Sequence, residues 1–185
     1  MKKRSGSLAV FLDRDGTLLK ERGYLSDPKK IRFYPGVFPP LKALTQAKIK
    51  LVIVTNQSGV GRGFFTTERL NEIHHALKTR LRKKGVAIAG IYFCPHHPAV
   101  ACVCRKPKIT LPKRAARALK LNLKKSYVVG DQMRDLEMAR RLGAKGILVL
   151  TGAGQSGYGR AKRIATKVTK TLSSACQWIL RDIAI

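Results

Sequence analysis

Two aspartates near the start of the chain are the clearest candidates for chemistry. Asp13 and Asp15 flank Arg14 directly after the apolar run 8–12, and Gly16 follows them. Carboxylates this close repel each other when both are ionised, and a divalent cation such as Mg²⁺ relieves that repulsion while leaving one carboxylate free to attack phosphorus. An aspartate turn is also common without any catalytic role. The interpretation therefore depends on partners elsewhere in the chain.

Three further polar segments can supply such partners. Thr55 opens a segment that offers a hydroxyl and several backbone amides to a phosphoryl oxygen. Arg105 and Lys106 place two cations side by side. Asp131 and Asp135 follow another apolar run, and Asp131 can complete the oxygen shell of the metal. Four segments of this kind in one chain indicate phosphate chemistry more strongly than any one of them.

A second metal site is predicted from the spacing C-x-H-x5-C-x-C, formed by Cys94, His96, Cys102 and Cys104. Three thiolates and one imidazole complete a tetrahedral shell for Zn²⁺ with no open position for substrate, so this ion should be structural. His97 is an alternative to His96, although the alternation with Cys94 favours His96. The loop leads directly into the two adjacent cations, so zinc binding should fix where they point.

Short apolar runs and amphipathic stretches alternate along the chain and define the elements that position these groups. The runs predict buried strands, and the stretches between them predict helices. This alternation predicts an α/β fold with a doubly wound, Rossmann-like parallel sheet whose active site lies at the carboxyl ends of the strands. We expect residues 1–185 to form a single domain with no large cap domain, and residues 18–35 to form a short hairpin flap. The predicted strands are 8–12, 51–54, 88–93, 127–129 and 147–150, and the predicted helices are 37–47, 67–84, 111–121, 135–142 and 172–182.

The four polar loops, in this order, resemble those of the haloacid dehalogenase superfamily of aspartyl-phosphate phosphatases. This resemblance implies that Asp13 attacks the phosphoryl group, while Asp15 protonates the leaving oxygen and then activates water. It implies that Thr55 and Lys106 stabilise the transferring group. It also implies that Mg²⁺ is held by Asp13, the backbone carbonyl of Asp15 and Asp131.

With the zinc loop included, residues 8–150 resemble the D-glycero-D-manno-heptose 1,7-bisphosphate 7-phosphatase family, part of a zinc-containing subgroup that is similar to histidinol phosphatases. The motifs concerned lie at 11–18, 23–25, 55–63, 94–98 and 105–107. The resemblance implies removal of the 7-phosphate in carbohydrate metabolism, during synthesis of the heptose precursor of lipopolysaccharide or of glycoprotein sugars. It assigns substrate binding to Glu21, Arg22, Gly23, Tyr24, Asn56, Gln57, Ser58, Arg105 and Gln132.

Two positions depart from this family's pattern. Gln132 stands where many relatives carry Lys or Arg, which removes one contact to the second phosphate. The segment 108–112 lacks the Pro-Gly turn that usually follows Arg-Lys-Pro. In the same family comparison, Asp135 is expected to orient Lys106 or a metal-bound water rather than to bind the ion.

Three alternative functions compete with this interpretation. A histidinol-phosphate phosphatase would share the loops, but its relatives tend to carry Asp where Ser58 stands. A polynucleotide 3'-end phosphatase would use the basic surface, but aromatic residues, which would stack on bases, make up only 6% of the chain. A basic binding module that keeps the fold without catalysis is disfavoured because Asp13, Asp15 and Lys106 are all retained.

The composition is strongly basic, with 38 Lys and Arg against 10 Asp and Glu and a formal net charge of +28. Such a charge attracts phosphorylated substrates and makes nucleic acid a possible partner. Nucleic acid is not favoured, because few aromatic residues are available to stack on bases. No apolar run is long enough to cross a bilayer, and the basic start lacks the core of a secretion signal. We therefore expect a cytoplasmic monomer without a membrane partner. The basic stretch 160–170 is interpreted as a solvated tail. The pattern Gly152-x-Gly154-x-x-Gly157 has the spacing of a dinucleotide-binding motif, but we interpret it as a flexible turn.

Overall fold

The computed structural model describes residues 6–21 and 23–184 of the chain. Six strands pair in parallel to form one sheet in the order β3-β2-β1-β4-β5-β6. The strands are short and apolar, as expected for a parallel sheet that is buried on both faces. They are β1 (Ala9–Leu12), β2 (Lys50–Asn56), β3 (Ile88–Cys94), β4 (Tyr127–Gly130), β5 (Lys145–Val149) and β6 (Lys167–Thr169).

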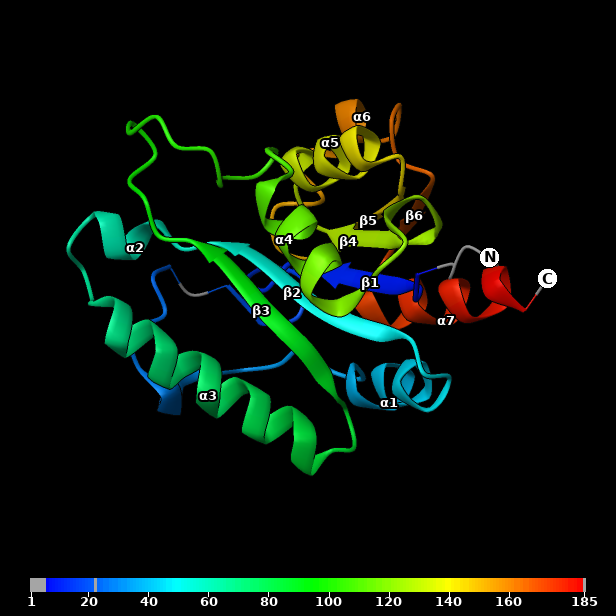
Figure 1. Cartoon of the computed structure of the whole chain (residues 1–185), viewed down its shortest axis with the longest axis horizontal. Helices are drawn as coiled ribbons and strands as arrows, with labels where there is room; N and C mark the ends of the chain where they lie inside the picture. The colour runs from blue at the N-terminus through cyan, green and yellow to red at the C-terminus, as the bar shows by residue number, and fades with distance from the viewer. Residues whose placement is uncertain (1–5, 22, 185) are drawn as a thin grey trace.

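Helices cover both faces of the sheet, which confirms the predicted doubly wound fold (Figure 1). The helices and helical turns are α1 (Phe38–Gln46), α2 (Ser58–Gly61), α3 (Thr67–Lys83), α4 (Thr110–Leu119), α5 (Met133–Leu142), α6 (Tyr158–Ala161) and α7 (Leu172–Ile183), with 3₁₀ turns η1 (Pro28–Lys30) and η2 (Leu123–Lys125). Successive residues of β1 point to opposite faces, so Val10 and Leu12 pack with α1, α3 and α7, whereas Ala9 and Phe11 pack with α4 and α5.

The strand order reverses at β1, which pairs with β2 on one side and with β4 on the other. Ligands of open α/β sheets bind at such a reversal, beside the carboxyl ends of the strands. The loops after β1, β2 and β4 therefore lie next to one another although they are far apart in the sequence. The fold alone therefore places three of the four predicted polar loops at one edge.

The predicted flap is present in outline. Leu19 and Phe33 form an antiparallel bridge, and the Lys20 N–H donates to the Arg32 carbonyl at 2.9 Å. The segment thus returns on itself as a hairpin does, but its two arms form isolated bridges instead of regular strands. Arg22, one of the predicted substrate-binding residues, lies outside the described residues.

The basic stretch 160–170 is folded, and its interpretation as a solvated tail is wrong. β6 pairs in parallel with β5, and Ala161 packs against Leu136 and Leu148 in a small third core. Its basic side chains point to solvent at the surface, which made the stretch resemble a tail in the sequence. Among the described residues, none of the helices is both long and apolar enough to span a bilayer.

Candidate active site

A buried lysine joins two of the aspartate loops. The Lys106 ammonium donates to Asp13 Oδ1 and to Asp135 Oδ1, each at 2.6 Å, and all three side chains are almost fully buried. Burial opposes the charge of Lys106, but the two carboxylates more than offset this effect and raise its pKa above the ordinary value. Lys106 therefore remains a cation between the loops that follow β1 and β4.

Asp131 lies behind these groups, fully buried. Its carboxylate accepts a hydrogen bond from the Thr17 hydroxyl at 3.3 Å and another from the Ala153 N–H at 2.8 Å. Gly16 has φ +80°, and a Cβ there would lie 2.3 Å from Asp131 Oδ2, so only glycine lets the first loop approach this carboxylate. One carboxylate oxygen from each of Asp13, Asp131 and Asp135 lies within 4.8 Å of the others.

The charge of this cluster is unbalanced, since three buried carboxylates face the single ammonium of Lys106. Burial raises the pKa of Asp13 to about 8, against the opposing effect of Lys106, and the neighbouring carboxylates add to the increase. Burial likewise raises the pKa of Asp131 to about 6, although the Ala153 N–H opposes it. A divalent cation among these oxygens would restore the charge balance, so the residues present fit Mg²⁺.

Asp15 is held by a buried arginine, a role for Arg14 that the sequence did not reveal. The Arg14 Nε donates to Asp15 Oδ2 at 2.9 Å, and Arg14 is only 1% exposed. Arg14 also donates to Gln57 Oε1 at 2.7 Å and lies 3.2 Å from His74 Nε2 on α3. Gln57 in turn donates to Asp15 at 2.8 Å and to the Thr55 hydroxyl at 2.7 Å. These contacts fix the direction of the Asp15 carboxylate.

A cavity of about 300 Å³ opens over these groups at the carboxyl edge of the sheet. Asp131 does not line it, because this side chain is completely buried behind the front of the site. The other predicted catalytic and substrate-binding residues within the described chain do line it, namely Asp13, Asp15, Glu21, Gly23, Tyr24, Thr55, Asn56, Gln57, Ser58, Arg105, Lys106 and Gln132.

Arg134 also lines the cavity and was missed in the sequence. It lies in the first turn of α5, and its guanidinium donates to the Gln132 side chain. Arg105 is a second cation of the lining, and its buried Nε has no hydrogen-bond partner among the described residues. Neither arginine forms an ion pair with a carboxylate in the described part of the chain. One signal in the sequence could have indicated Arg134. It follows two residues after Gln132, the position where many relatives carry Lys or Arg.

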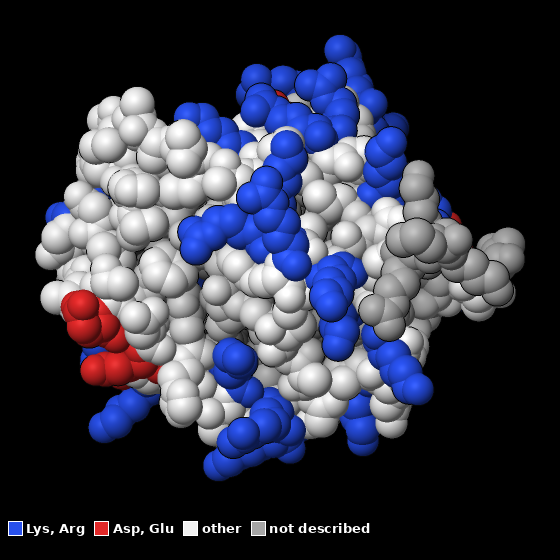
Figure 2. Space-filling view, viewed as in Figure 1, with Lys and Arg blue, Asp and Glu red and all other residues white. Residues whose placement is uncertain are grey.

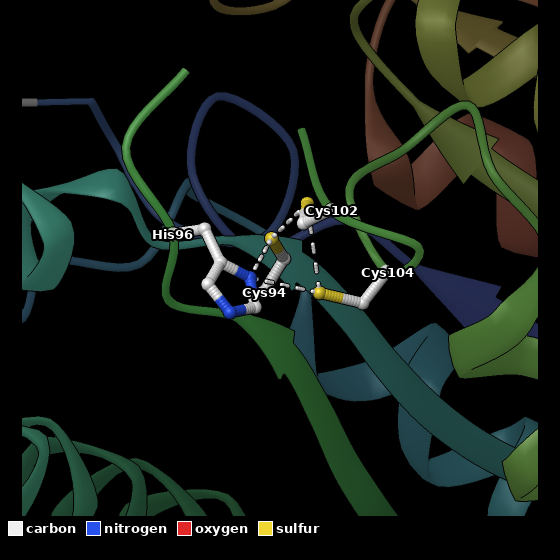
Figure 3. A group of neighbouring side chains, drawn as sticks. All are labelled: Cys94, His96, Cys102 and Cys104. Atoms are coloured by element: carbon white, nitrogen blue, oxygen red, sulfur yellow. Dashed lines mark hydrogen bonds between the residues drawn. The ribbon is translucent and has the colours of Figure 1, made fainter. Parts of the chain in front are cut away.

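The four predicted zinc ligands converge, as Figure 3 shows. His96 Nδ1 lies 3.5 Å from Cys94 Sγ and 3.2 Å from Cys104 Sγ, while Cys102 Sγ lies 3.6 Å and 3.8 Å from the other two sulfurs. Zinc–sulfur bonds of about 2.3 Å in a tetrahedron require sulfurs about 3.8 Å apart, so this spacing suits the ion. His97 Nδ1 instead accepts the Ala99 N–H at 3.1 Å.

The cysteine and histidine loop is tied to the cavity. Arg105 follows Cys104 directly, and its guanidinium donates to the His96 carbonyl. The next residue, Lys106, is held through its backbone, since its N–H donates to Asn56 Oδ1 at 3.0 Å. The loop geometry therefore determines where both cations of the Arg105-Lys106 pair enter the site.

Comparison with known proteins first gives the class. Residues 103–175 match the HAD-hydrolase-like family, and together with the relatives described next this match shows that the chain is a haloacid dehalogenase-type hydrolase. The chain is 35% identical to the D-glycero-beta-D-manno-heptose-1,7-bisphosphate 7-phosphatase of Yersinia pestis, over 95% of this chain and 91% of that protein. The Haemophilus ducreyi protein of the same name is 39% identical, over 85% of this chain and 91% of its own length.

A solved structure agrees with these relatives. The D,D-heptose 1,7-bisphosphate phosphatase from B. bronchiseptica, complexed with magnesium and phosphate, superimposes with a TM-score of 0.87 at 32% identity, covering 95% of this chain and 99% of that one. The chain therefore belongs to the D-glycero-D-manno-heptose 1,7-bisphosphate 7-phosphatase family, and it is a phosphatase of the haloacid dehalogenase superfamily. The resemblance found in the sequence is confirmed.

Proposed function

We propose that this protein hydrolyses the 7-phosphate of D-glycero-D-manno-heptose 1,7-bisphosphate, with Asp13 as the nucleophile and Mg²⁺ as the catalytic ion. Membership of the family supports the substrate. The observation on which the mechanism depends is the placement of Asp13 and Asp15 in one cavity, with the Lys106 ammonium 2.6 Å from Asp13. A nucleophile, an acid and a cation for the phosphoryl oxygens are thus available together.

The reaction follows two displacements on phosphorus. An Asp13 carboxylate oxygen forms a bond to phosphorus while the bond to the sugar oxygen breaks, and Asp15 gives its proton to that leaving oxygen. Asp15 then accepts a proton from a water molecule, whose oxygen attacks phosphorus as the bond to Asp13 breaks. Thr55 and Lys106 hold the phosphoryl oxygens in both steps. Arg14 and Gln57 keep Asp15 directed at the reacting oxygen throughout.

Asp13, the backbone carbonyl of Asp15, and Asp131 would hold Mg²⁺. When bound, the ion supplies positive charge that keeps Asp13 ionised and draws electron density from the phosphoryl oxygens. Asp135 is better placed to orient Lys106, since its Oδ1 accepts the ammonium at 2.6 Å. Its Oδ2 also accepts the backbone N–H of Gln132 at 3.2 Å, which holds the carboxylate at the start of α5.

Cys94, His96, Cys102 and Cys104 would hold Zn²⁺ as a structural ion. The spacing of their ligand atoms supports this assignment, as does the absence of disulfides among the four described cysteines. The ion would supply no chemistry to the reaction, because four protein ligands leave no position for substrate.

Arg105 and Arg134 would bind the phosphate that is not hydrolysed. Both line the cavity, and both are free of ion pairs with the described carboxylates. Arg134 would thereby supply the positive charge that is missing at Gln132. Guanidinium groups suit this task because they offer several donors in a fixed plane to phosphate oxygens.

The test is a kinetic comparison of heptose 1,7-bisphosphate, histidinol phosphate and a 3'-phosphorylated oligonucleotide, each with and without Mg²⁺. We expect the highest kcat/KM for the heptose bisphosphate. Without Mg²⁺ we expect no hydrolysis of any of the three substrates. Higher kcat/KM for histidinol phosphate or for the oligonucleotide would contradict the substrate assignment. Full turnover in excess chelator would contradict the role of Mg²⁺.

A further inference from the structure

The turn that follows β5 contacts the aspartate loops through two hydrogen bonds and the flap through a third. The Ala153 N–H donates to Asp131 Oδ2 at 2.8 Å, and the Thr151 hydroxyl donates to the Gly16 carbonyl at 2.6 Å. The Gly152 N–H donates to the Tyr34 hydroxyl at the base of the flap, at 3.1 Å. The turn is therefore a further segment of the site, at the carboxyl end of the strand next to β4.

The close approach of this turn requires a glycine at its centre. Gly152 has φ +53°, and a Cβ there would lie 2.4 Å from Asp131 Oδ2 and 2.6 Å from the Gly16 Cα. By contrast, a Cβ at Gly157 in the same turn would approach nothing nearer than the Ala153 carbonyl, at 3.7 Å. The glycine at position 152 is thus explained by its contact with Asp131.

We propose that Thr151, Gly152 and Ala153 form a positioning segment that fixes the Asp131 carboxylate for Mg²⁺. This inference rests on the proposed role of Asp131 as a ligand of that ion. Both oxygens of Asp131 are held, Oδ1 by the Thr17 hydroxyl and Oδ2 by the Ala153 N–H, so the carboxylate cannot turn without losing a partner. Groups that orient a metal ligand in this way change metal affinity by about 10- to 100-fold when they are removed.

Thr151 extends the same effect to the first loop. Its hydroxyl is the partner of the Gly16 carbonyl, one residue after Asp15. The backbone carbonyl of Asp15 is the other proposed oxygen ligand in this region, so a shift of Gly16 would move it. The segment therefore fixes two of the three proposed ligands relative to each other, although it contributes no ligand itself.

The experiment titrates the zinc-loaded protein with MgCl₂ and measures the heat of binding. Gly152→Ala should weaken Mg²⁺ binding by about 10- to 100-fold, because the new methyl group displaces Asp131. Thr151→Val should weaken it by about 3- to 10-fold through loss of one hydrogen bond, and Thr151→Ser, which keeps the hydroxyl, should restore it. Gly157→Ala is the matched control and should bind Mg²⁺ within about twofold of the wild type, since its methyl group meets no close neighbour.

Wild-type affinity in both Gly152→Ala and Thr151→Val would overturn the inference, as would an equal loss in Gly157→Ala or a failure of Thr151→Ser to restore binding. Should Gly152→Ala not fold, the Thr151→Val and Thr151→Ser pair decides. Asp131→Asn separates this inference from the proposed function. If Asp131→Asn still binds Mg²⁺ as the wild type does, the ligand assignment is wrong; if it loses binding while the turn variants do not, only the positioning role is wrong.

Discussion

A buried arginine between the catalytic loop and α3 holds the proposed acid and base, Asp15. Arg14 contacts Asp15, Gln57 and His74, and each contact comes from a different segment of the chain. Burial and, to a smaller extent, the adjacent Arg14 guanidinium lower the pKa of His74 to about 3, against a smaller opposing effect of Asp15. The imidazole is therefore neutral near pH 7 and can accept a hydrogen bond from Arg14.

His74 gives the stability of the protein a predictable dependence on pH. The folded state keeps this imidazole neutral down to about pH 3, whereas in the unfolded chain it takes up a proton near its ordinary value of 6.5. The contribution of His74 to stability is thus complete above pH 6.5 and is lost as the pH falls below it. In His74→Gln, the glutamine side chain can still accept a hydrogen bond from Arg14, but it does not take up a proton as the pH falls.

Urea unfolding of the zinc-loaded protein without Mg²⁺, at pH 7 and at pH 5, measures this effect. We expect the free energy of unfolding to fall between pH 7 and pH 5 in the wild type and to fall less in His74→Gln. The difference between the two falls should be up to about 2 kcal/mol. His75→Gln is the control, because His75 is exposed on the other side of the same helix. Equal losses in wild type and His74→Gln would show that His74 is not kept neutral.

Sequence reasoning found the residues that occur in ordered motifs but not the contacts that join them. Asp13 and Asp131 could be predicted because each directly follows an apolar strand, and Lys106 because it belongs to the pair of cations that follows the cysteine and histidine loop. The contact of Arg14 with His74 could not, since 60 residues separate them and nothing in the sequence shows which helix covers the loop. Arg134 escaped notice because one charged residue in a helix is more often solvent-exposed than directed at a site.

At the scale of elements, the loop between β3 and α4 links a metal site to the cavity. It contains the four clustered ligands, then Arg105, and then Lys106, whose backbone is bonded to Asn56 at the end of β2. A loop of this length has no helix or strand of its own to hold it in one conformation. Metal binding is therefore the expected source of its order.

Replacement of one zinc ligand tests this dependence. Cys102→Ser should lower the zinc content and reduce kcat/KM by about 100-fold, because a displacement of Arg105 and Lys106 by about 1 Å is costly to catalysis. Cys176→Ala is the matched control: Cys176 is a buried residue of α7, far from the zinc loop in the sequence, so zinc content and kcat/KM should stay close to the wild type. Wild-type kcat/KM in a zinc-free Cys102→Ser protein would remove the structural role of the ion.

The longer elements could be predicted from the sequence, and the shortest could not. The five strands with near-continuous apolar runs and the helices α1, α3, α4, α5 and α7 all appear where the pattern indicated. β6 was missed because only Val168 in its three residues is apolar, so it has no recognisable strand pattern. The turn after β5 was expected to be flexible, but its contacts with Asp131 and Gly16 depend on neighbouring strands that the sequence did not order.

For the whole molecule, the main feature is its charge. Figure 2 shows Lys and Arg spread over the visible face, while Asp and Glu gather mainly in one small area. Four of the ten acidic residues are the site carboxylates Asp13, Asp15, Asp131 and Asp135, which leaves few on the remaining surface. The composition predicted this imbalance, and the structure adds that Asp13, Asp131 and Asp135 are buried and therefore leave the exposed surface still more basic.

A net charge of +28 should speed the capture of an anionic substrate. We expect kcat/KM for the heptose bisphosphate to fall by roughly tenfold between about 50 mM and about 500 mM salt at saturating Mg²⁺, because salt screens the attraction. The value of kcat should change by less than about twofold, since screening does not reach the buried groups. A fall in kcat with unchanged kcat/KM would contradict electrostatic capture.

The central claim is that the phosphoryl group is transferred to Asp13, and the most direct test is to trap it there. The zinc-loaded enzyme is mixed with heptose bisphosphate and Mg²⁺, quenched in acid within one turnover, digested and mapped by mass spectrometry. We predict one added phosphoryl group on the peptide that contains Asp13, and none in Asp13→Asn. Product release without any phosphorylated peptide, or with the group on another residue, would contradict the account.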